Sequence, residues 1–180
     1  MKITMSGTPA SGKSTIAKKV AELLNIKHFS MGDFQREIAR EKGITIKELG
    51  ELEKKDKSID RMVDEKQVEI GKNNFNLVID SRLGAYFIPD SIKVFVDANP
   101  DVRAKRRFLQ TRDEEKFKSI QDAKNEMILR ENANRDRFLE FYNFDFLDMN
   151  NYDLTIDSTD LTVLEAAEEI VNYAKKLENS

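Results

Sequence analysis

Short runs of apolar residues alternate along the chain with stretches that carry apolar residues at helical spacing. Runs of strand length lie at residues 2–5, 26–29, 76–80, 92–98 and 153–157. Helical spacing predicts a helix at 14–24 and another that begins near residue 160. Short buried strands separated by helices are typical of a parallel sheet with crossover connections. We therefore expect an α/β, three-layer fold, with a five-stranded parallel sheet and helices on both faces.

Two long segments interrupt this alternation. Residues 31–76 contain three helical patterns, at 33–42, 46–55 and 59–72. Residues 101–146 are strongly charged and have few apolar positions, which predicts a solvated helical hairpin. We interpret both segments as small helical lobes on one domain of residues 1–180. The core would then comprise residues 1–30, 77–100 and 147–180.

Composition narrows the classes of function. The chain has 180 residues and a formal net charge of −3, so a general affinity for nucleic acid or anionic lipid is not expected. It has no cysteine, which excludes thiolate metal sites. It has a single histidine, which argues against a catalytic triad that uses histidine. We expect His28 to be structural. No secretory signal or membrane span is evident, and the expectation is a cytoplasmic monomer.

The strand at 2–5 runs directly into GTPASGKST, which satisfies the phosphate-loop pattern G-x-x-x-x-G-K-[ST]. Glycines allow successive backbone N–H groups to turn inward around a phosphate, and the following helix adds the positive end of its dipole. In this pattern the lysine reaches the β- and γ-phosphates and the serine hydroxyl binds Mg²⁺. The predicted ATP site comprises Gly7, Thr8, Pro9, Ala10, Ser11, Gly12, Lys13, Ser14 and Thr15.

Asp80 ends the apolar run at 76–80, and an acid at this point of such folds can hold Mg²⁺. We predict Ser14 and Asp80 as the metal-binding residues. A guanine-nucleotide switch is disfavoured because the chain has no Asn-Lys-x-Asp reader and no Asp-x-x-Gly loop. A motor or AAA-type ATPase would be larger. A small chain with two lobes favours phosphoryl transfer between small molecules, with water excluded from the site.

Arginine placement supports an anionic acceptor. Seven of the eleven arginines lie between residues 101 and 146. Arginine suits bidentate phosphate recognition and the stabilisation of transition-state charge. Arg36 follows the second predicted strand and Arg82 follows the third, and ligands of open α/β sheets bind at that edge. Both are expected to contact an acceptor phosphate.

The motifs GTPASGKST, FSMGDFQR, SIDRMVDE, IDSRLG, RENANRDRF and YDLTIDST occur in this order. Together they resemble the archaeal-type cytidylate kinases, which are nucleoside monophosphate kinases, and the resemblance covers nearly the whole chain. The chain differs from the motifs expected of that family at Ser81, where a glycine would be usual, and at Asn134, where an acid or a serine would be usual.

The resemblance implies ATP as the phosphoryl donor, with Mg²⁺, and CMP or dCMP as the acceptor. Residues 31–76 would form the monophosphate-binding lobe and 101–146 the lid. Lys13, Arg130 and Arg137 would be catalytic, with Arg106 or Arg107 as a further candidate. The implied acceptor-binding residues are Ser30, Asp33, Arg36, Asp80, Arg82 and Gly84.

Two alternatives stay open. One is another small-molecule kinase of this fold, acting on AMP, UMP or a non-nucleotide such as shikimate. The other is a non-catalytic nucleotide-binding regulator, against which the presence of Lys13, Asp80, Arg82, Arg130 and Arg137 argues. The sequence does not define base or sugar preference. Phe34 and Tyr86 could stack on a base or pack in the core, and Arg112 and Arg135 are unassigned.

Overall fold

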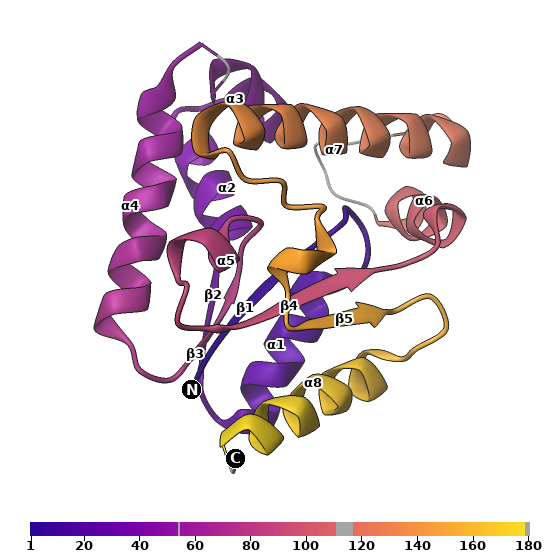
Figure 1. Cartoon of the computed structure of the whole chain (residues 1–180). Coiled ribbons are helices and arrows are strands. Elements are labelled where there is room, and N and C mark those ends of the chain that lie inside the picture. The colour runs from indigo at the N-terminus through magenta and orange to yellow at the C-terminus, as the bar shows by residue number, and fades with distance from the viewer. Residues whose placement is uncertain (54, 111–116, 179–180) are drawn as a thin grey trace.

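A parallel sheet of five strands forms the centre of the molecule, in the order β2-β3-β1-β4-β5 (Figure 1). The structure is a computed structural model that describes residues 1–53, 55–110 and 117–178. The predicted fold class and all five predicted strands are confirmed, with ends that differ by at most two residues. The strands are β1 (Lys2–Gly7), β2 (Lys27–Ser30), β3 (Leu77–Asp80), β4 (Ile92–Asp97) and β5 (Leu154–Asp157).

The helices cover both faces of this sheet. The described α-helices are α1 (Lys13–Leu24), α2 (Met31–Glu41), α3 (Ile46–Glu53), α4 (Lys57–Asn73), α5 (Gly84–Phe87), α6 (Pro100–Leu109), α7 (Ile120–Tyr142) and α8 (Val163–Glu178). Two short elements were not predicted, α5 and a 3-10 helix at Met149–Asn151, because one turn of helix has too few residues to display a period. Within the described ranges, no helix is both long and apolar enough to cross a membrane.

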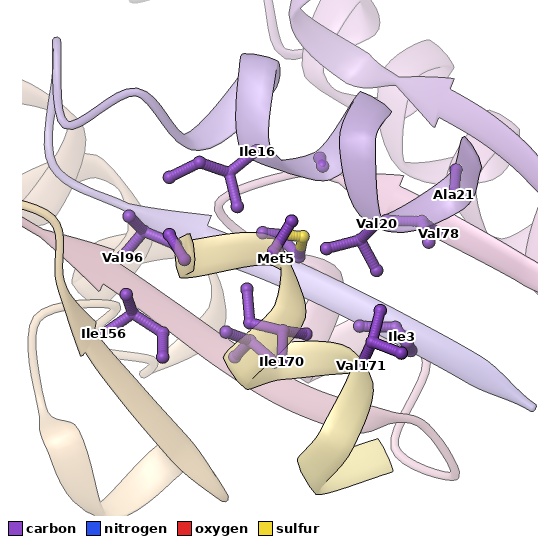
Figure 2. Packing of buried hydrophobic residues seen from close by; sticks show 14 of the residues in the cluster. Ile3, Met5, Ile16, Val20, Ala21, Val78, Val96, Ile156, Ile170 and Val171 are labelled. Atoms are coloured by element: carbon purple, nitrogen blue, oxygen red, sulfur yellow. The ribbon is translucent and has the colours of Figure 1, made fainter. Parts of the chain in front are cut away.

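One face of the sheet packs against α1 and α8. Figure 2 shows the cluster that they form, in which Val20 of α1 and Ile170 of α8 meet Met5 of β1. All three side chains are fully buried. Burying a side chain of this size contributes about 1.5–3 kcal/mol to stability. The packing of α1 and α8 therefore stabilises β1, the strand that leads into the phosphate loop.

The opposite face carries the remaining helices. Leu49 of α3 and Ile59 of α4 pack with Ile79 of β3, whereas Phe138 of α7 packs with Phe95 of β4. The segments 31–76 and 101–146 therefore each have a small apolar base on the sheet. In the N-terminal half of α7, Ala123 and Met127 are buried, whereas Ile128 remains 43% exposed.

Candidate active site

The phosphate loop joins β1 to α1, as the sequence predicts. A Cβ at Gly7 would lie 2.2 Å from the backbone oxygen of Val96, so only glycine fits where the loop leaves the strand. Gly12, the N-cap of α1, has a φ of 86°, which is left-handed backbone that favours glycine. The side chains of Ser14 and Thr15 lie exposed on the first turn of α1.

Hydrogen bonds tie this loop to the ends of two neighbouring strands. The Thr8 hydroxyl donates to Asp97 Oδ1 at 2.6 Å. The Ser158 hydroxyl, just after β5, donates to the Ser11 carbonyl oxygen at 2.6 Å. Ser158 was not predicted as a site residue, although it lies within the YDLTIDST motif. The loop is thus held in shape by the last residue of β4 and by the residue that follows β5.

Lys13 and Asp80 form an ion pair at the same edge of the sheet. The Asp80 side chain is 2% exposed and that of Lys13 is 15% exposed. Burial, followed by repulsion from Arg82 and Arg36, lowers the pKa of the Lys13 amine well below its usual value. The carboxylate of Asp80 supplies the opposite charge that a buried ammonium group needs.

The end of β2 presents the first acceptor candidates. Ser30 is the N-cap of α2, and its hydroxyl oxygen accepts a hydrogen bond from the backbone N–H of Asp33 at 3.1 Å. Asp33 in turn pairs with Arg36 one turn along the helix. Burial acts to raise the pKa of the Asp33 carboxyl, but its hydrogen bond and ion pair with Arg36 outweigh that effect and lower the pKa. Arg36 is therefore held at the mouth of the site by its own helix.

The turn after β3 presents the second set. Arg82 lies in this turn, where burial and repulsion from Arg130 and Arg137 lower its pKa to about 9. Gly84 begins α5, and a Cβ there would lie 3.0 Å from the Cβ of Thr4. Gly84 thus permits close packing of the turn against β1, which is a structural reason for glycine at this position.

The helix α7 brings Arg130 and Arg137 over the same edge. Burial, repulsion from Arg36 and, more weakly, repulsion from Arg137 lower the pKa of Arg130. The charges of Arg36 and Arg137 thus act on the neighbouring cations Lys13, Arg82 and Arg130. We call these five residues the cation cluster. Converging cations in a partly buried site favour the binding of phosphates, whose negative charge relieves their mutual repulsion.

Two buried acids adjoin this cluster, and sequence reasoning did not identify them. Arg137 Nη1 lies 2.6 Å from Glu53 Oε2 of α3 and 3.7 Å from Asp60 Oδ1 of α4. Glu53 Oε1 also accepts a hydrogen bond from Gln35 at 2.8 Å. Asp60 lies in the SIDRMVDE motif, but Asp64 and Gln67 follow it on the same side of the helix, so the local pattern gave no signal that Asp60 would be buried.

Asp60 differs from Glu53 in having a free acceptor. Its Oδ2 atom is buried and has no hydrogen-bond partner among the described residues. Burial and the carboxylate of Glu53 raise the pKa of Asp60 to about 6, although Arg137 opposes the shift. A buried acceptor without a donor is costly, which indicates a position where a ligand N–H or O–H can bind.

Other arginines of the segment 101–146 have different surroundings. Arg106 donates to the carbonyl oxygen of Ser158 at 2.7 Å and thereby holds the loop after β5. Arg107 is buried, and Arg135 pairs with Asp145 on the surface. Arg112 lies outside the described residues.

The remaining candidates are less informative. Burial lowers the pKa of His28, and its Nε2 atom has no hydrogen-bond partner within the described part of the chain. Phe34 packs against the apolar cluster under α2, α3 and α4. Tyr86 is 43% exposed, and its ring lies edge-on to that of Phe87 and tilted against those of Tyr142 and Phe144.

The predicted metal ligands fit Mg²⁺ by their chemistry. Ser14 offers a hydroxyl oxygen on the first turn of α1, and Asp80 offers a carboxylate at the end of β3. Oxygen ligands beside substrate phosphates are what Mg²⁺ prefers in proteins. No group of three or more His, Cys, Asp or Glu side chains suited to a metal occurs in the described ranges. A site completed by phosphate oxygens needs no such group.

Comparison with known proteins gives a consistent family assignment. The family model described as "Cytidylate kinase-like family" matches residues 2–160. A cytidylate kinase of Archaeoglobus fulgidus is 37% identical over 159 residues, which are 88% of this chain and 86% of that protein.

A second relative is much longer than this chain. An S-adenosylmethionine-dependent nucleotide dehydratase of Lacinutrix mariniflava is 39% identical over 178 residues, which are 97% of this chain. The chain spans only 36% of that relative's length. Among solved structures, a shikimate kinase from Bacteroides thetaiotaomicron superposes with a TM-score of 0.67 and 19% identity, over 100% of this chain and 99% of that one. This likeness supports the fold alone.

Proposed function

The chain belongs to the cytidylate kinase-like family, and on that premise we propose that it transfers the γ-phosphoryl group of ATP to CMP or dCMP. The products would be ADP and CDP or dCDP. The bond from the γ-phosphorus to its bridging oxygen breaks, and a bond forms to an oxygen of the acceptor phosphate. The acceptor oxygen is already ionised, so the reaction requires no strong general base.

The observation that carries the proposal is the free Asp60 carboxylate oxygen beside the cation cluster. Arginines bind the acceptor phosphate, and a buried carboxylate accepts a hydrogen bond from an N–H group. Cytosine carries an exocyclic amino group, whereas uracil carries a carbonyl oxygen at the same position. A carboxylate would repel that carbonyl, so Asp60 supports CMP over UMP.

The chain's residues divide the remaining work. Backbone N–H groups of the loop and Lys13 bind the donor phosphates. Arg36 and Arg82 orient the acceptor, and Arg130 stabilises the charge that develops on the transferring group. Mg²⁺, held by Ser14 and Asp80, would neutralise charge on the β- and γ-phosphate oxygens. Helices α3 and α7 close over the site and exclude water, which would otherwise hydrolyse ATP.

Shikimate and AMP should be included as alternative acceptors, because this chain shares its fold with a shikimate kinase. The nucleotide dehydratase activity named for the longer relative is not part of the proposal, because the matched segment is 36% of that protein. A non-catalytic nucleotide-binding role predicts no acceptor-dependent ADP release.

The decisive experiment measures ADP release from ATP and Mg²⁺ with CMP, dCMP, UMP, AMP, GMP and shikimate in turn. CMP or dCMP should stimulate ADP release most strongly, and a lack of stimulation by either would refute the proposal. The variant Asp60→Asn should lower kcat/KM for CMP by about 10- to 100-fold relative to UMP. Asp136→Asn, which alters an exposed acid on α7, serves as a control and should leave this ratio unchanged.

A further inference from the structure

Helix α4 carries a row of polar residues on a face that is otherwise buried. Asp60, Asp64 and Gln67 are spaced four and three residues apart, so they lie along one side of the helix. Each contacts a residue outside the helix, and two of the three contacts are with α7. Asp60 lies near Arg137 of α7, and Asp64 accepts a hydrogen bond from the hydroxyl of Tyr142, at the end of α7.

Gln67 makes the third contact, with the turn that follows β3. Its Oε1 atom accepts a hydrogen bond from the hydroxyl of Ser81 at 2.7 Å. Its Nε2 atom donates to Asp64 Oδ1 at 3.3 Å. Gln67 is 1% exposed and Ser81 is 6% exposed, so neither hydrogen bond is exchanged readily for one with water.

The direction of each hydrogen bond is determined by its neighbours. The backbone N–H of Leu83 donates to the Ser81 hydroxyl at 3.3 Å, and that hydroxyl donates onward to Gln67. The amide of Gln67 must then direct its NH₂ group to Asp64, whose other oxygen accepts from Tyr142. Glutamine is the side chain that both accepts and donates here, so a carboxylate at position 67 would lose one link.

This hydrogen-bond network reaches the turn after β3, which carries two charged residues of the candidate active site. Ser81 lies between Asp80, which pairs with Lys13, and Arg82, which belongs to the cation cluster. The backbone of the turn is anchored toward β1, since the N–H of Ser81 donates to Met5 and the hydroxyl of Ser6 donates to the carbonyl oxygen of Arg82. On the side that faces α4, the hydrogen bond from Ser81 to Gln67 anchors the same turn.

We propose that Gln67 is a positioning residue that holds the Asp80–Arg82 turn in its reactive geometry and links that turn, through Asp64 and Tyr142, to helix α7. The kinetic consequence rests on the proposed phosphoryl transfer, whereas the positioning of the turn does not. A displacement of about 1 Å in a reacting group can cost about 100-fold in rate. Loss of the hydrogen bond between Ser81 and Gln67 should therefore lower kcat, because it displaces Asp80 and Arg82.

The test compares Gln67→Met, which keeps the side-chain volume and removes both hydrogen bonds, with Ser91→Ala. Ser91 is also 6% exposed, and its hydroxyl donates a buried hydrogen bond to the carbonyl oxygen of Ile88. The Ser91 oxygen also shares a hydrogen bond with Thr4 at 2.9 Å, so Ser91→Ala removes two buried hydrogen bonds, as Gln67→Met does, without removing any that Ser81 or Gln67 makes. Gln67→Met should lower kcat by about 10- to 100-fold and leave KM for ATP nearly unchanged, whereas Ser91→Ala should alter neither.

A second measurement does not depend on catalysis. Amide hydrogen exchange at Leu83 should accelerate in Gln67→Met and in Ser81→Ala, but not in Ser91→Ala. Gln67→Glu keeps the acceptor for Ser81 and removes the donor to Asp64, so it should protect Leu83 more than Gln67→Met does. Unchanged exchange at Leu83 in Gln67→Met would overturn the inference, as would a kcat no lower than that of Ser91→Ala. If the wild-type chain phosphorylates no acceptor, the proposed function fails, and the exchange measurement still decides this inference.

Discussion

The ammonium group of Lys13 and the carboxylate of Asp80 are paired across the edge of the sheet where the proposed substrates meet. Both groups are assigned other partners in the proposed reaction, since Lys13 binds donor phosphates and Asp80 contributes to the Mg²⁺ site. The binding of ATP therefore requires an exchange, in which phosphate replaces the carboxylate as the partner of Lys13. Asp80 is thereby released at the point where Mg²⁺ is needed.

This exchange predicts the behaviour of Asp80→Asn. Removing one partner of a buried ion pair destabilises a protein by about 3 kcal/mol, because the other charge is left uncompensated. ATP added without Mg²⁺ supplies that missing charge, so it should raise the melting temperature of Asp80→Asn more than that of the wild type. Thermal unfolding in EDTA, with and without ATP, measures both effects.

A matched control is Asp90→Asn, which removes an ion pair with Lys2 at 2.7 Å in which the Asp90 side chain is 65% exposed. Such pairs contribute about 0–1 kcal/mol, so this variant should resemble the wild type in stability and in its response to ATP. An equal response to ATP in the wild type and Asp80→Asn would show that the pair does not compete with nucleotide.

Arg130 and Arg137 are expected to differ although they lie on the same helix. Arg130→Ala should lower kcat by about 10³-fold with little loss of stability, since its positive charge is directed to the phosphates. Arg137→Ala should lower both kcat and the free energy of unfolding, the latter by about 3 kcal/mol, because Glu53 would be left buried and unpaired. Urea unfolding and steady-state kinetics separate the two effects.

Arg135→Ala provides the comparison for this pair of variants. Arg135 lies on the same helix, and its ion pair with Asp145 leaves the arginine side chain 47% exposed. Its removal should change kcat and stability little. Wild-type turnover in Arg130→Ala would remove that residue from the proposed mechanism.

Asp60 predicts a specific dependence of stability on pH. Its pKa is raised from 3.8 to about 6 in the folded chain, so the folded state binds the proton more tightly than the unfolded state does. The resulting stabilisation is complete below about pH 4 and is lost as the pH rises through 6. Relative to Asp60→Asn, the wild type should therefore lose on the order of 1 kcal/mol between pH 4 and pH 7, after allowance for solvent screening.

Urea unfolding of both proteins at several pH values measures this difference directly. The other titrating groups are common to the two proteins, so they largely cancel in the comparison. A difference that stays constant across this range would mean that Asp60 titrates at its ordinary pKa. The side chain would then be better hydrated than its burial indicates.

Local sequence determined the phosphate loop, the five strands and the main helices. Gly7, Gly12 and Lys13 act within one strand–turn–helix unit, and apolar periodicity is a property of neighbouring residues. For the same reason, Arg36 and Arg82 could be placed at the carboxyl edge of the sheet, since each follows a predicted strand.

The tertiary structure alone decided the strand order and the partners of charged residues far apart in the chain. Glu53 and Arg137 are 84 residues apart, and neither segment shows by its pattern that the two will meet. Asp60 and Gln67 likewise appear as ordinary polar positions on a helix until packing of α4 buries them beside Arg137 and Ser81. The physical reason is that burial and electrostatic coupling depend on how the elements pack, whereas loop and helix formation depend mainly on residues adjacent in sequence.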